Sequence, residues 1–283
     1  MTVPAWLNRL VEAASNPVRV RPWQRELPPT GQPGHRQSAV LLLFAPTGGG
    51  TAGSPGVAGS SATAGSSTAT GSPTATGRVE AAGSPAAAEP RSAPEGDSAG
   101  PGPALSGGHD TLDLSNVSIL LTERAHTLRS HAGQISFPGG RAEPQDPDLV
   151  STALRETHEE VGVEPDTVEV AGVLPALNLS VSAHDVSPVL GWWARPGRVW
   201  AREPAEVASV LQVPVADLVD PANRFRVGSP SGWIGPAFDA DGLLVWGFTA
   251  MVLADILQVA GWEVPWDTSD VRPFPPSRGT QRA

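Results

Sequence analysis

The chain has 283 residues, of which 19 are basic and 29 acidic, so its formal net charge is −10. This acidic balance argues against sequence-independent nucleic-acid binding, which needs a cationic surface. Cysteine is absent, which excludes disulfides, thiolate metal sites and a cysteine nucleophile. No apolar run approaches the roughly 20 residues of a membrane-spanning helix, and the first residues lack a secretory signal pattern. We therefore expect a soluble, cytoplasmic protein with neither a membrane nor a nucleic-acid partner.

The first predicted element is an amphipathic helix over residues 5–14, which follows a proline. Its apolar face is expected to pack on the core or on a second copy of the chain, which leaves a homodimer open. Short apolar strands are predicted over residues 38–45 and 117–122.

A low-complexity stretch separates these two strands. Of the 64 residues at positions 46–109, 54 are Gly, Ala, Ser, Thr or Pro. So few apolar side chains cannot offset the entropy lost on ordering, so we predict a disordered insertion over residues 46–110. An interdomain linker is the alternative, but residues 1–45 are too few to form a stable domain unaided.

The remainder of the chain mixes strand and helix patterns, which favours an α/β or α+β sandwich. We predict a lead-in over residues 1–34, one domain over 35–262 that the insertion interrupts, and a flexible tail over 263–283. The strands are expected at residues 169–174, 186–193, 224–227 and 242–246, and the helices at 206–211, 215–219 and 249–259.

A further helix is predicted over residues 147–161. Asp146 is a good N-cap, and Pro147 then occupies the first helical position, where its missing N–H costs nothing. Gly162 is a natural C-terminal stop.

Three carboxylates gather on this helix. Glu156 and Glu160 are four residues apart and Glu159 lies between them, so all three share an arc of about 100°. Like charges at this spacing destabilise a bare helix, whereas oxygen donors on one face suit Mg²⁺ or Mn²⁺. A solvated acidic face is the alternative, but the glycine turn at Gly139 and Gly140 can bring a backbone carbonyl to the same metal ion.

This stretch resembles the Nudix box of the Nudix hydrolases, because Arg155, Glu156, Glu159, Glu160 and Gly162 match the Arg-Glu-x-x-Glu-Glu-x-Gly half of that signature. The resemblance implies an α-β-α sandwich with a mixed β-sheet. The loop before the arginine is one residue longer than usual. A loop of this length is typical of the coenzyme A diphosphatase subfamily. Several segments of the chain are also similar to that subfamily: residues 120–124, 128–134, 137–140, 186–189, 206–214 and 245–250.

The resemblance implies that water attacks the pyrophosphate of a small nucleotide substrate related to coenzyme A, with Mg²⁺ or Mn²⁺ as cofactor. Glu156, Glu160 and the Gly140 or Gly139 carbonyl would bind metal. Glu159 would be a further ligand or the base that activates water, and Arg155 would orient the glutamates.

Substrate phosphates need cationic partners, and guanidinium groups bind them in a planar, bidentate manner. The candidates beside the glycine turn are Arg124, Arg129 and His131; the alternative is that these side chains only fasten the loop to the core. Two other functions stay open: a Nudix enzyme for a nucleoside triphosphate, an ADP-sugar or a dinucleotide, and a Nudix-like binding protein without catalysis.

Overall fold

The structure is a computed structural model that describes residues 2–15, 30–31, 35–48, 112–179, 184–229 and 232–273. Apart from residues 46–48, the predicted insertion lies outside the described residues.

The helices at residues 5–14, 215–219 and 249–259 are confirmed, the last with two extra residues at its start. The α-helices described are α1 (Ala5–Ala14), α3 (Leu149–Val161), α4 (Val215–Val219) and α5 (Gly247–Val259).

The larger sheet contains eight strands, and its main path runs β3-β2-β1-β7-β5. β1 and β7 are parallel, while the other pairings in this sheet are antiparallel, so the sheet is mixed. β4 pairs with β1, β6 with β7, and β8 with β2. Its strands are β1 (Arg36–Pro46), β2 (Val117–Arg124), β3 (Ile135–Ser136), β4 (Gly139–Arg141), β5 (Glu169–Val173), β6 (Leu177–Leu179), β7 (His184–Trp192) and β8 (Val207–Pro214).

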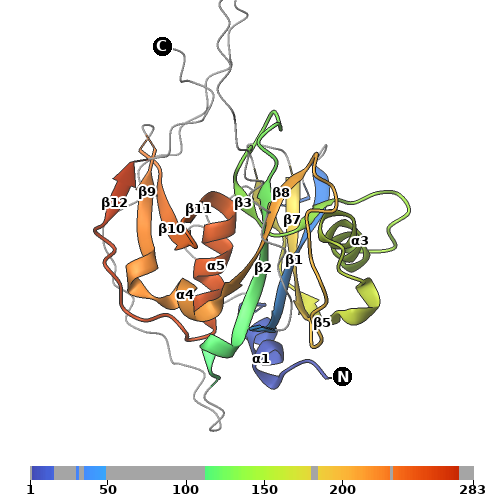
Figure 1. Cartoon of the computed structure of the whole chain (residues 1–283), viewed down its shortest axis with the longest axis horizontal. Helices are drawn as coiled ribbons and strands as arrows, with labels where there is room; N and C mark the ends of the chain where they lie inside the picture. Colours follow the sequence, from blue (N-terminus) through green and yellow to red (C-terminus); the bar gives the residue numbers. More distant parts are fainter. Residues whose placement is uncertain are drawn as a thin grey trace, which may run out of the picture.

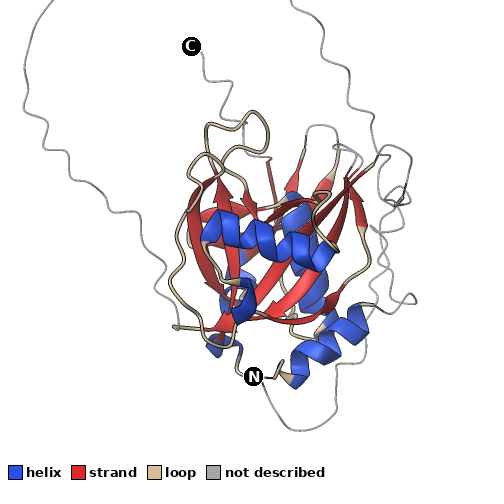
Figure 2. Ribbon diagram, turned by 90° about the vertical axis from the view of Figure 1, so that its right-hand side faces the viewer, coloured by secondary structure: helices blue, strands red, loops and turns tan. Residues whose placement is uncertain are grey.

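Helices cover both faces of this sheet (Figure 1). Side chains alternate between the faces of β1: Leu41 and Leu43 join the core beneath α3, whereas Leu42 and Phe44 join the core that α1 and α5 cover. In the view of Figure 2, α3 lies in front of the strands and α5 behind them. The molecule is therefore an α-β-α sandwich with a mixed sheet, as predicted.

A second sheet has the order β11-β10-β9-β12 and lies beside α4 and α5 (Figure 1). Its strands are β9 (Arg224–Gly228), β10 (Ile234–Ala240), β11 (Leu243–Val245) and β12 (Val271–Pro273). Residues 263–273, which we expected in a flexible tail, contact this sheet: β12 pairs with β9, and Glu263 pairs with the buried Arg224 at 2.9 Å. The domain thus extends further than the sequence indicated, and residues 274–283 lie outside the described residues.

One predicted helix is wrong. The pattern of residues 206–211 indicated a helix, but residues 207–211 form the start of β8, which pairs with β2 from Ser118 to Arg124. Pairing with a buried neighbouring strand overrides a weak local preference of this kind.

Candidate active site

Helix α3 carries the acidic residues, and polar side chains fix its start. Asp148 is the N-cap, since its carboxylate accepts hydrogen bonds from the backbone N–H of Ser151 at 2.7 Å and from the Ser151 hydroxyl at 2.8 Å. The predicted N-cap, Asp146, is wrong, as is the predicted start at residue 147. Gly162 ends the helix with a φ of 76°, in the left-handed region that glycine adopts readily.

Asp146 instead binds Arg155 from the side of the helix. The guanidinium donates to both carboxylate oxygens of Asp146, from Nε at 3.0 Å and from Nη2 at 2.9 Å. This pairing, with the backbone N–H of Glu143, holds the pKa of Asp146 well below its usual range. The bidentate geometry leaves the guanidinium in one fixed orientation.

From that orientation Arg155 reaches two of the three helix glutamates. Its Nη1 donates to Glu156 at 3.1 Å and to Glu159 at 3.1 Å, while Nη2 also donates to the backbone carbonyl of Arg141 at 3.1 Å. One cation therefore joins α3, the preceding loop and β4.

Glu160 has the most unusual environment of the three. Glu160 is only 5% exposed to solvent. Its carboxylate accepts a hydrogen bond from the backbone N–H of Gly139 at 3.1 Å. Burial raises the pKa of Glu160 to about 8, and the neighbouring charge of Glu156 adds to this rise. The Gly139 N–H and the cationic Arg124 oppose it but do not cancel it. A buried carboxyl group of this kind stays neutral unless a nearby cation stabilises its ionised form.

The two glycines before the helix bring backbone close to these carboxylates. At Gly140 a Cβ atom would lie 2.4 Å from the Glu156 carboxyl carbon, so no larger residue fits without a shift. Gly139 has a φ of 149°, and a Cβ there would lie 2.3 Å from the Ala39 carbonyl. Contact with the β1 backbone therefore requires glycine at position 139, whereas a larger residue at position 140 would displace the Glu156 carboxylate.

Glu156 is half-buried, and this burial raises its pKa above the usual value. The positive charge of Arg155 and its hydrogen bond to Glu156 partly offset the rise. The carboxylate of Glu206 raises the pKa of both Glu156 and Glu160. The sequence indicated no chemical role for Glu206. It lies at the end of β2 because β8 pairs with β2, and the backbone N–H of Ala125 donates to its carbonyl at 2.7 Å.

The three predicted phosphate-binding residues occupy different places. Arg124, at the end of β2, lies near enough to lower the pKa of Glu160, and its buried Nε has no hydrogen-bond partner. Arg129 and His131 are exposed in the turn between β2 and β3. His131 has a φ of 58° and contacts the Gln134 side chain at 2.9 Å. The structure thus places Arg124 near the buried Glu160, and Arg129 and His131 on an exposed turn.

The carboxylates of α3 are the candidate ligands for a metal ion. Among the described residues, no three acidic or histidine side chains form a ready-made metal site. Arg155 binds Glu156 and Glu159. The donor chemistry nevertheless fits Mg²⁺ or Mn²⁺, since Glu160 and Glu156 are oxygen donors whose ionisation a nearby cation would favour.

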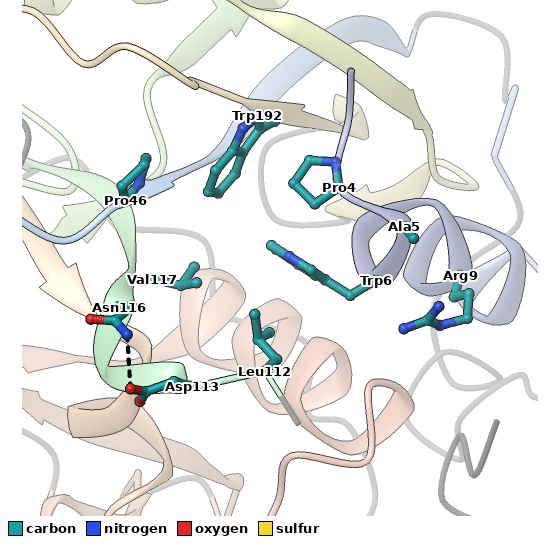
Figure 3. Close-up of a pocket in the computed structure, with 10 residues that line it drawn as sticks. All are labelled: Pro4, Ala5, Trp6, Arg9, Pro46, Leu112, Asp113, Asn116, Val117 and Trp192. Atoms are coloured by element: carbon teal, nitrogen blue, oxygen red, sulfur yellow. Dashed lines mark hydrogen bonds between the residues drawn. The ribbon is translucent and has the colours of Figure 1, made fainter. Parts of the chain in front are cut away.

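A cavity of about 630 Å³ lies between α1 and the ends of β1 and β7. Trp6, Trp192 and Pro46 are among its lining residues, which Figure 3 draws as sticks. None of the predicted site residues lines it. Val40, which pairs with Gly139, is six residues from Pro46, roughly 20 Å along an extended strand. The cavity is therefore separate from the glutamate site.

In the part of the chain that the structure describes, no helix is both long and apolar enough to span a membrane.

Comparison with known proteins identifies the family. The NUDIX domain model matches residues 111–229. A Salmonella paratyphi B protein named "Uncharacterized Nudix hydrolase NudL" is 39% identical over 147 residues, which are 49% of this chain and 72% of that protein. The crystal structure of a NUDIX hydrolase from Alicyclobacillus acidocaldarius is 14% identical with a TM-score of 0.38, over 78% of this chain and 90% of that one. The chain belongs to the Nudix hydrolase family and is an enzyme of that family.

Proposed function

We propose that this Nudix hydrolase uses Mg²⁺ or Mn²⁺ to hydrolyse the pyrophosphate bond of coenzyme A or an acyl-coenzyme A. The products are 4′-phosphopantetheine, or its acyl form, and adenosine 3′,5′-bisphosphate. The observation that carries the proposal is the buried Glu160 beside Gly139, with Glu156 directly under Gly140. The choice of coenzyme A rests on the resemblance of residues 120–140 and of the longer loop to the coenzyme A diphosphatases.

In this proposal Glu156, Glu160 and the Gly140 carbonyl would hold the metal, and Glu159 would either join them or take a proton from the attacking water. When bound, the metal supplies positive charge that neutralises the pyrophosphate. Glu159 suits proton transfer because its side chain is 56% exposed and is held by Arg155 at 3.1 Å.

Arg155 orients the glutamates rather than touching substrate, since its guanidinium is bound by Asp146, Glu156 and Glu159. Arg124 is the strongest candidate for a phosphate contact, because its buried Nε lacks a partner and an anion would supply one. Arg129 and His131 would meet the substrate from the neighbouring turn.

The test is turnover of a panel containing coenzyme A, acetyl-coenzyme A, ADP-ribose, NADH, 8-oxo-dGTP and diadenosine polyphosphates, each with Mg²⁺ or Mn²⁺ and with EDTA. We expect preferred, EDTA-sensitive release of adenosine 3′,5′-bisphosphate. Preference for another compound would retain the Nudix chemistry and reject coenzyme A as the substrate. If the folded protein turned over nothing, it would be a binding protein.

A further inference from the structure

A second group of polar side chains lies next to the glycine turn, at the edge where β1 and β7 begin. On the parallel pair β1–β7, Arg36 is opposite His184, and on the antiparallel pair β1–β4, Ser38 is opposite Arg141. Paired residues, and residues two apart on one strand, project to the same face of a sheet. Arg36, Ser38, Arg141 and His184 therefore share one face, and we call them the basic cluster.

A hydrogen bond confirms this arrangement, because the Ser38 hydroxyl and Nδ1 of His184 are 2.6 Å apart. Ser38 is buried, whereas Arg36 and Arg141 are exposed. The bonded side chains fix the position of the imidazole, and the arginines lie at the solvent side of it.

The basic cluster adjoins the glutamate site, but on the opposite face of the sheet. A Cβ at Gly140 would point at Glu156 on α3. The side chain of the next residue, Arg141, consequently projects away from α3. The backbone carbonyl of the same Arg141 accepts a hydrogen bond from Arg155, so the position of the basic cluster is tied directly to that of the glutamates.

The charges of the basic cluster are not compensated within the described residues. Neither Arg36 nor Arg141 makes an ion pair there. Burial and then these two arginines lower the pKa of His184, and no carboxylate opposes them. Like charges brought together in this way are unfavourable, and in a chain of net charge −10 the local excess of positive charge is unusual. A bound anion would relieve it.

We propose that the basic cluster binds a phosphate monoester on the nucleoside part of the substrate, namely the 3′-phosphate that distinguishes coenzyme A from 3′-dephospho-coenzyme A. This inference rests on the proposed function. The 3′-phosphate and the cleaved pyrophosphate are carried by the same ribose. Among the described strands β4 pairs with β1 alone, so a ribose at the other edge of β4 could present one phosphate to each face of the sheet. Arg36 and Arg141 would contact the phosphate oxygens, and Ser38 would hold the His184 ring as a further donor.

The first test compares kcat/KM for coenzyme A and 3′-dephospho-coenzyme A in the full-length protein with Mg²⁺. The wild type should prefer coenzyme A by roughly tenfold to a hundredfold, as expected for charge-assisted hydrogen bonds to one phosphate. Arg36→Gln and Arg141→Gln should each lose most of that preference, mainly through coenzyme A. Arg9→Gln, at the distant cavity, is the matched control and should retain it.

If the wild type hydrolyses both compounds equally well, the 3′-phosphate site is refuted while the proposed function stands. If it hydrolyses neither, the proposed function fails, and the site is then tested by calorimetry alone. Adenosine 3′,5′-bisphosphate should bind more tightly than adenosine 5′-monophosphate, and Arg36→Gln and Arg141→Gln should remove the difference. Equal binding of the two nucleotides, or equally tight binding of inorganic phosphate, would overturn the inference.

Discussion

Replacing Glu160 with glutamine should stabilise the metal-free protein at pH 8. Glu160 is 5% exposed, and burial raises its pKa from an ordinary 4.5 to about 8. Below pH 4.5 both the folded and the unfolded protein carry the proton. Between pH 4.5 and 8 the unfolded chain releases it while the folded protein keeps it, so the free energy of unfolding falls as the pH rises.

The size of this effect follows from the shift. At 1.36 kcal/mol per pKa unit, a rise from 4.5 to 8 corresponds to about 5 kcal/mol in total, of which about 4 kcal/mol is lost by pH 8. Glutamine cannot ionise, and its amide oxygen can still accept the Gly139 N–H bond. Glu160→Gln should therefore remove this loss and leave the contacts of α3 in place.

The assay is urea unfolding in EDTA at pH 5.5 and pH 8. The wild type should lose at least ~2 kcal/mol more than Glu160→Gln between these two pH values, because the other titrating groups are common to both proteins. Glu159→Gln is the control, since that side chain is 56% exposed, and it should follow the wild type. If the free energy of unfolding changed equally with pH in the wild type and in Glu160→Gln, Glu160 would not be a neutral buried acid. The assignment of Glu160 as a metal ligand would then lose its support.

Three further outcomes follow from the geometry. Arg155→Lys should lower kcat at least tenfold, measured with the preferred substrate, because one ammonium cannot make the bidentate contacts of the guanidinium; unchanged kcat would reject the orienting role. Gly140→Ala should abolish activity in a folded protein, since its Cβ would meet the Glu156 carboxylate at 2.4 Å, whereas Gly197→Ala, with 3.7 Å of clearance, should stay active. Replacing residues 49–111 with a short Gly-Ser loop should preserve the melting temperature and activity, because β1 and β2 are already antiparallel neighbours; loss of folding would contradict this.

The sequence predicted α3 to within two residues at its start, because its glycine stop and its acidic and apolar faces are local features. It failed at the N-cap for a reason that is not local. Asp146 is as good a capping residue as Asp148, and only the folded loop shows that both oxygens of Asp146 are taken by Arg155.

The strands show the same division. β1 and β2 contain continuous apolar runs and were predicted. The strands β5, β7, β9 and β11 were also predicted, from shorter groups of apolar and β-branched residues. β4 consists of two glycines and an arginine and carries no such pattern, although it is the strand that contacts Glu156 and Glu160. It exists because β1 pairs with it on one side and α3 packs over it on the other, and neither contact can be read from three residues.

The part of the site that the sequence could not supply is therefore the register of the sheet. A shift of one residue in β4 would turn Arg141 toward α3 and Gly140 away from it. The glutamates would then contact the guanidinium of Arg141 instead of the backbone of the glycine pair. The basic cluster would lose one of its two arginines. Two features hold the register: the φ of 149° at Gly139, with the Ala39 carbonyl where its Cβ would be, and the hydrogen bond from Arg155 to the Arg141 carbonyl. The same strand thus separates two sites of opposite charge, with the acidic one facing α3 and the basic one facing away.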